Sequence, residues 1–346
     1  MSARPSAFTC VRLRGLVLAV VLAGAAAGNA LAEPMVDKLR INFHLTPHAN
    51  KPEWTWSPAV RFRLFGVVSS ADTVSVEYTL PNGQRWLTTR CDIDPTTSDA
   101  ESQVINGCGA RIEDALSTNA VGNVAFRILL SNALSGRNAT LFSGRFNVGR
   151  TLYNPDKSAA RNRQFYYHVD NDWRLPMAYV GVHRNETHHQ FYTELWFKNR
   201  INDKSKVNAY LILNGNTVAE AWASTVLSVS PPETVQQHYE LFGFKFNATT
   251  DKPVSAGYNE SFKTYENPGE YEVKVLRDGK LARHFKVRVG PDGKAVDTGV
   301  VRQNGLSTEG AVVPVNVLGA DDGTWSRSAW KTEAIWGNPI IGFSVP

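Results

Sequence analysis

The chain has 346 residues, of which 42% are hydrophobic and 20% charged, a balance typical of a folded globular protein rather than a disordered one. Its formal net charge is +5, and removal of the three arginines in the first 32 residues lowers it to +2. Because nucleic-acid binding needs a clustered basic face, this small and evenly spread charge argues against a nucleic-acid partner.

The first 32 residues have the three parts of a secretory signal peptide. Three arginines and no acidic residue begin the chain, an apolar stretch follows from 15 to 27, and the small residues Ala30 and Ala32 predict cleavage before Glu33. The apolar stretch is shorter than the roughly 20 residues of a spanning helix, and no later stretch is apolar enough. We therefore expect a periplasmic or extracellular mature chain without a membrane span.

Two cysteines, Cys91 and Cys108, remain after the predicted cleavage. In an oxidising compartment they predict a disulfide. A loop of this size contributes roughly 3 kcal/mol in the loop-entropy model.

Strand patterns dominate the mature chain. Segments such as 60–64 and 271–275 alternate apolar and charged residues, which is typical of strands with one face in a core. Helical periodicity is confined to two short stretches, 112–117 and 233–242. Asn-Gly and Asp-Gly turns interrupt the strands at the spacing of a sandwich. The sequence predicts an all-β fold of antiparallel β-sandwich domains.

An internal repeat runs through the strands. Gly122–Leu129 and Gly269–Leu276 align without a gap as Gly, x, apolar, x, apolar, basic, apolar, Leu. Three further pairs of similar segments follow the same order along the chain: 63–65 with 194–196, 76–83 with 209–215, and 145–149 with 286–290. The shared order predicts two tandem domains that arose by duplication.

The repeat sets the expected domain boundaries. They are a signal peptide at 1–32, a first sandwich at 35–150, a linker at 151–164, a second sandwich at 165–290 and a C-terminal extension at 291–346. The extension contains Trp325, Trp330 and Trp336. Because three tryptophans are costly to leave in water, we expect it to pack on the second domain or between the two.

The segment 267–275 reads Asn-Pro-Gly-Glu-Tyr-Glu-Val-Lys-Val. It resembles the Pro-Gly-x-Tyr-x-Val-x-Val strand near the end of many immunoglobulin-like modules of exported proteins. The resemblance implies a corner tyrosine at Tyr271, whose hydroxyl bonds back to the chain. It concerns architecture alone, since the first copy has Val124 at this position and such modules serve many functions.

A histidine-rich hairpin is the best candidate metal site. A four-residue turn would set His183 opposite His188, with Cβ atoms about 5 Å apart. Two imidazoles at this distance can share Zn²⁺ or Cu²⁺, with Glu186 or His168 completing the shell. The alternative is a polar hairpin whose histidines are solvated. The sequence has no closely spaced set of ligands that would favour the metal site over this alternative.

The loop between the cysteines is acidic and is a candidate for Ca²⁺, through Asp92, Asp94, Asp99 and Glu101. It lacks the glycine of an EF-hand loop and contains Pro95. A solvated loop held by the disulfide is therefore the favoured interpretation.

Exposed tryptophans are candidates for stacking on sugar rings. Trp54 and Trp56 are two residues apart, so on a strand they would point to the same face, and they lie beside prolines. We therefore expect them to be exposed and to form the sugar-binding site. The wider set of candidates is Trp86, Trp173, Trp222 and the three tryptophans of the extension. Trp196 lies between Leu195 and Phe197 and is expected in the core.

No catalytic motif is present: the sequence has no Gly-x-Ser-x-Gly, His-Glu-x-x-His, P-loop or Cys-x-x-Cys pattern. Three hypotheses follow, in order of preference. The first is an exported non-enzymatic protein that binds a partner or supports the envelope, the second a carbohydrate-recognition protein, and the third a metal-dependent enzyme at the His183 hairpin. The expected partner is thus a protein or a glycan outside the cytoplasm, and no cofactor is predicted.

Overall fold

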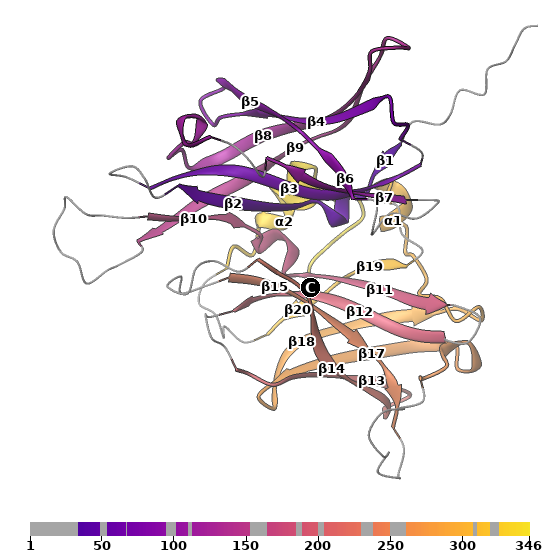
Figure 1. Ribbon diagram of the computed structural model, residues 1–346. Coiled ribbons are helices and arrows are strands. Elements are labelled where there is room, and N and C mark those ends of the chain that lie inside the picture. Colours follow the sequence, from indigo (N-terminus) through magenta and orange to yellow (C-terminus); the bar gives the residue numbers. More distant parts are fainter. Residues whose placement is uncertain are drawn as a thin grey trace, which may run out of the picture. The chain divides into compact units, whose positions relative to one another are not determined.

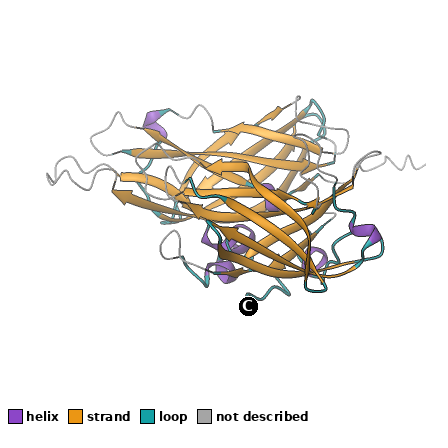
Figure 2. Ribbon diagram, turned by 90° about the horizontal axis from the view of Figure 1, so that it is seen from below, coloured by secondary structure: helices purple, strands orange, loops and turns teal. Residues whose placement is uncertain are grey.

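The computed structural model of the chain describes residues 34–48, 54–66, 68–94, 102–109, 113–152, 165–184, 189–199, 204–229, 238–249, 261–306, 310–318 and 325–346. Strands dominate these residues, and the helical segments are short turns (Figure 1, Figure 2). Every strand pairing among them is antiparallel. The predicted all-β sandwich class is confirmed.

Two five-stranded sheets are built from the first half of the chain. The first has the order β1-β3-β7-β6, with β2 also on β3. Its strands are β1 (Met35–Val36), β2 (Asn42–His48), β3 (Thr55–Phe65), β6 (Asp92–Asp94) and β7 (Ser102–Cys108). The second has the order β10-β9-β8-β4-β5. Its strands are β4 (Asp72–Thr79), β5 (Arg85–Arg90), β8 (Gly122–Asn132), β9 (Arg137–Leu152) and β10 (Phe165–Asp170).

The third sheet has ten strands in the order β19-β11-β12-β15-β14-β13-β17-β18-β20, with β16 on β14. They are β11 (Met177–Arg184), β12 (His189–Asn199), β13 (Val207–Leu213), β14 (Asn216–Val229), β15 (His238–Lys245), β16 (Asn247–Ala248), β17 (Gly269–Arg277), β18 (Lys280–Val289), β19 (Ala311–Pro314) and β20 (Asn316–Val317). β14 pairs with β13 up to Trp222 and with β15 from Ala223, so one strand belongs to two halves of the sheet.

Short 3₁₀ and α turns connect the strands: η1 (Lys38–Arg40), η2 (Asp114–Leu116), η4 (Asp172–Arg174), η5 (Thr264–Glu266), α1 (Val300–Gln303), α2 (Ala329–Thr332) and α3 (Ala334–Gly337). η2 lies in the helical stretch expected at 112–117. The other expected stretch, 233–242, is strand β15 from His238 onward.

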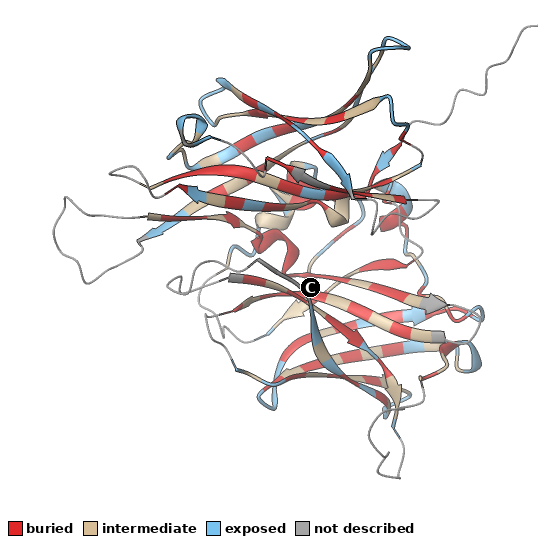
Figure 3. Cartoon of the chain, viewed as in Figure 1, coloured by how far each residue is buried: buried red, intermediate tan, exposed pale blue. Residues whose placement is uncertain are grey.

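Alternating burial along the strands builds two large hydrophobic cores (Figure 3). In β8, Val124, Phe126 and Ile128 are buried and their neighbours face outward. The first core is formed mainly by the two five-stranded sheets and the second by the ten-stranded sheet. The period-two pattern of the sequence therefore predicts the inward faces of these strands.

The matched segments of the repeat occupy corresponding places. β8 lies between β4 and β9, and β17 lies between β13 and β18. Val76 pairs with Ile128, and the residues aligned with them, Ala209 and Val275, pair with each other. Both copies also have an irregularity in the ladder directly after Ile128 and Val275. The alignment of the two halves thus extends to strand register.

One predicted segment belongs elsewhere than expected, and the C-terminal extension contacts both halves of the chain. Phe165–Asp170, assigned to the second sandwich, pairs as β10 with β9 of the first half. The C-terminal extension adds β19 to β11 and β20 to β18, but its last part packs into the first core through Trp336, Ile340 and Phe343. The extension therefore contacts both the first core and the third sheet, which agrees with the expected alternative of packing between the two halves.

Candidate functional site

The segment from Asp170 to Arg174 connects β10 of the second sheet to β11 of the third. It contains the 3₁₀ turn η4. Asn171, Asp172 and Arg174 are each at most 4% exposed. Buried polar groups need partners, so their contacts decide whether this cluster is structural or available for chemistry.

The Asp172 carboxylate is surrounded by donors. Its Oδ1 accepts a hydrogen bond of 2.6 Å from the Tyr239 hydroxyl and lies 3.0 Å from Lys198 Nζ, and its Oδ2 accepts one of 2.7 Å from the Ser326 amide. Asp170 Oδ1 accepts from the amide of Asp172 at 2.8 Å. Burial and the two carboxylates raise the pKa of Tyr239 well above 10, which keeps it a neutral donor. The carboxylate thus connects η4, β12, β15 and the start of the last described segment.

Arg174 carries a buried charge enclosed by aromatic rings. Its guanidinium carbon lies 4.7 Å from the centroid of Trp173 and 4.6 Å from those of Trp196 and Trp336. One of its nitrogens donates to the Ile41 carbonyl at 2.7 Å. Burial lowers the pKa of Arg174 to about 9, so it remains charged at neutral pH. Cation–π attraction therefore compensates part of its desolvation.

A second polar contact lies at η1. Arg40 pairs with Glu194 of β12 at 3.0 Å. Asp37 caps η1 by accepting from the Leu39 amide at 3.1 Å, and burial raises its pKa to about 6 against the opposing effect of Arg40. The buried charges of the described residues thus connect segments from both halves of the chain.

The register of the β11–β12 hairpin changes the predicted metal site. His183 pairs with Gln190 and Arg184 with His189, so His183 does not face His188. The sequence placed the pairing two residues too early on β12. Glu186 and His188 lie outside the described residues.

His168 does not complete a ligand set in the described part of the chain. It lies on β10 opposite Gly149, whose missing Cβ leaves room for the imidazole: a Cβ there would be 2.7 Å from His168 Nε2. Burial lowers the pKa of His168, which favours the neutral ring. The described residues contain no group of three or more His, Cys, Asp or Glu arranged to hold a metal ion.

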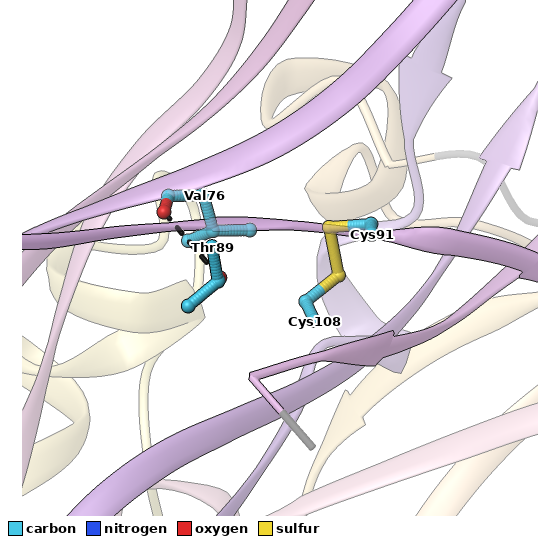
Figure 4. Close-up of a disulfide and its surroundings, with 4 residues drawn as sticks. All are labelled: Val76, Thr89, Cys91 and Cys108. Carbon is cyan, nitrogen blue, oxygen red and sulfur yellow. Dashed lines mark hydrogen bonds between the residues drawn. A yellow bond between two sulfur atoms is a disulfide. The ribbon is translucent and has the colours of Figure 1, made fainter. Parts of the chain in front are cut away.

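The predicted disulfide is present (Figure 4). Cys91 follows β5 of the second sheet and Cys108 ends β7 of the first, so the bond connects the two sheets. Nearby, Thr89 donates to the Val76 carbonyl at 3.5 Å. Of the proposed calcium ligands, Asp92 and Asp94 are on β6. Asp99 and Glu101 lie outside the described residues.

The expected exposure of Trp56 is wrong. Its side chain is 0% exposed, and its indole nitrogen donates to the Ala120 carbonyl at 2.9 Å. Trp86 packs edge-on against it with the ring centroids 5.2 Å apart. Trp54 is half-buried. A ring enclosed by protein has no face for a sugar, so Trp56 belongs to the core.

Trp222 is the exposed tryptophan. It is 66% exposed and lies on β14 at the point where the strand changes partners. The local sequence places small alanines inward, at Ala219 and Ala221, and Glu220 and Trp222 outward. This alternation was the signal that the sequence interpretation did not use, because tryptophan in a sandwich usually lies in the core.

Two rows of side chains cross the outer face of the sheet at Trp222. We call this surface, defined by the residues of the two rows, the Trp222 face. The first row, read along paired residues of β14, β13, β17 and β18, is Trp222, Asn208, Leu276 and Leu281. The second row, one alternation away, is Glu220, Tyr210, Lys274 and His284. The first row is mainly apolar and the second is polar.

Comparisons with known proteins give few matches. A scan against family models finds none, and a search of curated proteins finds none. Among solved structures, a Bacteroides fragilis protein provisionally described as a cell adhesion protein matches with a TM-score of 0.13 and 7% identity, over 64% of this chain and 76% of that one. The BSP domain of a biofilm-associated protein matches with a TM-score of 0.17 and 9% identity, over 78% of this chain and 62% of that one.

One finding bears on membrane association. Within the described ranges, no helix has the length and apolar character needed to cross a bilayer.

Proposed function

We propose that the protein is an exported, non-enzymatic interaction protein that binds its partner through the Trp222 face. The observation that carries this proposal is the 66% exposure of Trp222 on a regular sheet. Removing a tryptophan indole from water is favourable. Large aromatic rings on surfaces are also enriched where partners bind.

The buried polar cluster supports a binding role over a catalytic one. Asp172 is at most 4% exposed, and its carboxylate already contacts Tyr239, Lys198 and Ser326. A catalytic carboxylate must reach a substrate, whereas this one joins four segments of the protein. Its chemistry is that of a structural contact.

Export is supported by the predicted signal peptide at 1–32 together with the Cys91–Cys108 disulfide, since such bonds persist in oxidising compartments. We also propose two tandem immunoglobulin-like sandwiches that arose by duplication, the first of which includes β10 (Phe165–Asp170) and the second of which begins at β11 (Met177–Arg184). The matched registers of β4–β8 and β13–β17 support this, as does the bond from the Tyr271 hydroxyl to the Asn267 carbonyl, which is the expected tyrosine corner.

The binding proposal is tested by co-sedimentation of the purified mature protein with bacterial envelope fragments. Wild-type protein should sediment with the fragments, and Trp222→Ala should remain in the supernatant. Leu134→Ala is the matched control, because Leu134 is 89% exposed and apolar but lies in the β8–β9 turn. Equal sedimentation of all three proteins, or of none, would refute the proposal.

Export is tested by expressing the full chain and sequencing the N-terminus of the protein in the periplasmic or extracellular fraction. The expected product begins at Glu33 and carries an oxidised Cys91–Cys108 pair. A cytoplasmic product that keeps Met1 and has free thiols would contradict export.

A further inference from the structure

We infer that the Trp222 face binds an uncharged glycan chain laid across the strands, with a sugar ring stacked on Trp222. The inference rests on the proposed function and adds the chemical class of the partner. It rests on three features of the surface: an apolar row, a parallel polar row and the balance of charges between them.

The apolar row has the dimensions of an extended ligand. Trp222 and Leu281 are 66% and 39% exposed and lie at opposite ends of four adjacent strands. Three strand spacings separate them, which is about 14 Å. A flat chain of several sugar units can lie along such a row.

The polar row provides hydrogen-bonding groups along the side of the apolar row. Asn208 Nδ2 donates to the Tyr210 hydroxyl at 2.7 Å, which orients the phenol beside the apolar row. Glu220 of β14 pairs with Tyr210 of β13 and is exposed. Sugar rings have apolar faces and hydroxyl-bearing edges. Parallel apolar and polar rows match that division.

The charges on this face and in the adjoining row, which contains Glu272 and Lys286, compensate one another. Glu272 Oε1 lies 3.1 Å from Lys274 Nζ and 2.9 Å from His284 Nε2. The hydrogen bond from Lys274 is the largest contribution that holds the pKa of Glu272 below its ordinary value. Glu220 and Glu272 are balanced by Lys274 and by Lys286, which pairs with Glu272 across the strands. A surface with paired charges attracts neither polyanions nor polycations over a distance, and this favours a neutral ligand.

A protein partner fits the same surface less well. The centre of a protein interface is depleted of charged residues, and a stable interface needs about 800 Å² on each side. Here Lys274 lies one alternation and Glu272 two alternations from the apolar row, and only a few apolar side chains are exposed. Hydroxyl groups of a glycan can bond to such charged side chains without displacing the ion pairs.

The inference is tested by affinity gel electrophoresis and titration calorimetry of the mature protein. The probes are soluble neutral polysaccharides (dextran, galactomannan, xyloglucan and laminarin) and the acidic polysaccharides alginate and polygalacturonate. At least one neutral polymer should retard the protein and the acidic ones should not. Trp222→Ala should weaken binding at least about tenfold, which corresponds to about 1.4 kcal/mol. Trp222→Tyr should retain part of the affinity, and Leu134→Ala should bind as wild type.

The other outcomes distinguish the two proposals. If envelope fragments bind through Trp222 but no neutral polysaccharide does, the glycan inference is overturned and the interaction function stands. Binding of acidic polymers alone, or neutral binding that survives Trp222→Ala, also overturns the inference. A concentration-dependent dimer in sedimentation velocity that Trp222→Ala abolishes would assign the face to a second copy of the chain instead.

Discussion

Asp37 and Arg174 are two buried charges with different compensation. Arg174 is surrounded by three indole rings and a carbonyl oxygen, and it stays charged at neutral pH with a pKa of about 9. Asp37 accepts a bond from the Leu39 amide, but burial outweighs its attraction to Arg40 and raises its pKa to about 6. Protonation of Asp37 is therefore coupled to folding at mildly acidic pH.

We expect Asp37→Asn to remove a pH dependence of stability between about pH 4 and pH 6. The pKa of Asp37 rises on folding from 3.8 to about 6, so the folded state binds the extra proton. This contribution is fully present below about pH 4 and is lost as the pH rises through about 6. Two pKa units correspond to about 3 kcal/mol. Asparagine keeps the capping acceptor without the charge.

Urea unfolding at several pH values between 4 and 8 measures this effect. The stability of the variant relative to wild type should increase from pH 4 to pH 6 and then stay constant. A difference that is independent of pH would show that Asp37 titrates alike in the folded and unfolded chains.

At the scale of elements, β9 and α3 make a contact that leaves no room for a side chain at Gly144. A Cβ at Gly144 of β9 would lie 2.6 Å from the carbonyl oxygen of Trp336 and 2.8 Å from a ring carbon of Phe142. Ile335 and Trp336 adopt left-handed backbone angles, with φ of 45° and 60°, which a β-branched residue such as isoleucine seldom does. The packing around the Trp336 indole stabilises this unfavourable backbone conformation.

Gly144→Ala should destabilise the protein by about 1–3 kcal/mol, because its methyl group meets backbone that cannot move aside. Thermal unfolding followed by circular dichroism measures the loss. Gly269→Ala is the control: its Cβ would meet the end of the flexible Leu213 side chain at 3.1 Å, so a smaller loss is expected. Equal losses in both variants would contradict a specific contact with α3.

The strand pattern of the elements was readable from the sequence, and their partners were only partly so. Alternation predicted the buried face of β8, because side chains of a strand point alternately to its two faces. The pairing of Ala209 with Val275 was not predicted, because matched residue types in two segments do not say which strands pair. The His183 pairing failed, since hairpin register depends on turn geometry that alternation does not encode. Trp222 was named only in the wider set of tryptophan candidates, and Trp54 and Trp56 were preferred, because the alternation that places Ala219 and Ala221 inward was not used.

At the scale of the whole molecule, residues far apart in sequence share one core. Trp336 is 1% exposed and packs against Phe43 and Phe126 of the first half at centroid distances of 5.1 and 6.4 Å. The same ring covers Arg174 at the connection to the third sheet. No short-range pattern in the sequence predicts such a contact, because it depends on where the extension folds back.

Trp336→Ala should cost about 3–5 kcal/mol, the range for removal of a large buried ring. Because this ring contacts both the first core and Arg174, unfolding should also become less cooperative, with near-ultraviolet dichroism and fluorescence no longer changing together. Trp330→Ala is the control, since Trp330 is only half-buried and packs edge-on against Phe343. A loss no larger than that of the control would contradict the packing of Trp336 in the core.

The position of Trp336 in the sequence also affects the order in which the parts of the first core are synthesised. A ribosome adds this residue 210 places after Phe126, so the strands of the first half are synthesised well before the ring that packs against them. We expect a chain cut upstream of Trp336 to lack this ring in the first core, to expose an apolar hollow there and to be cleaved more readily by proteases.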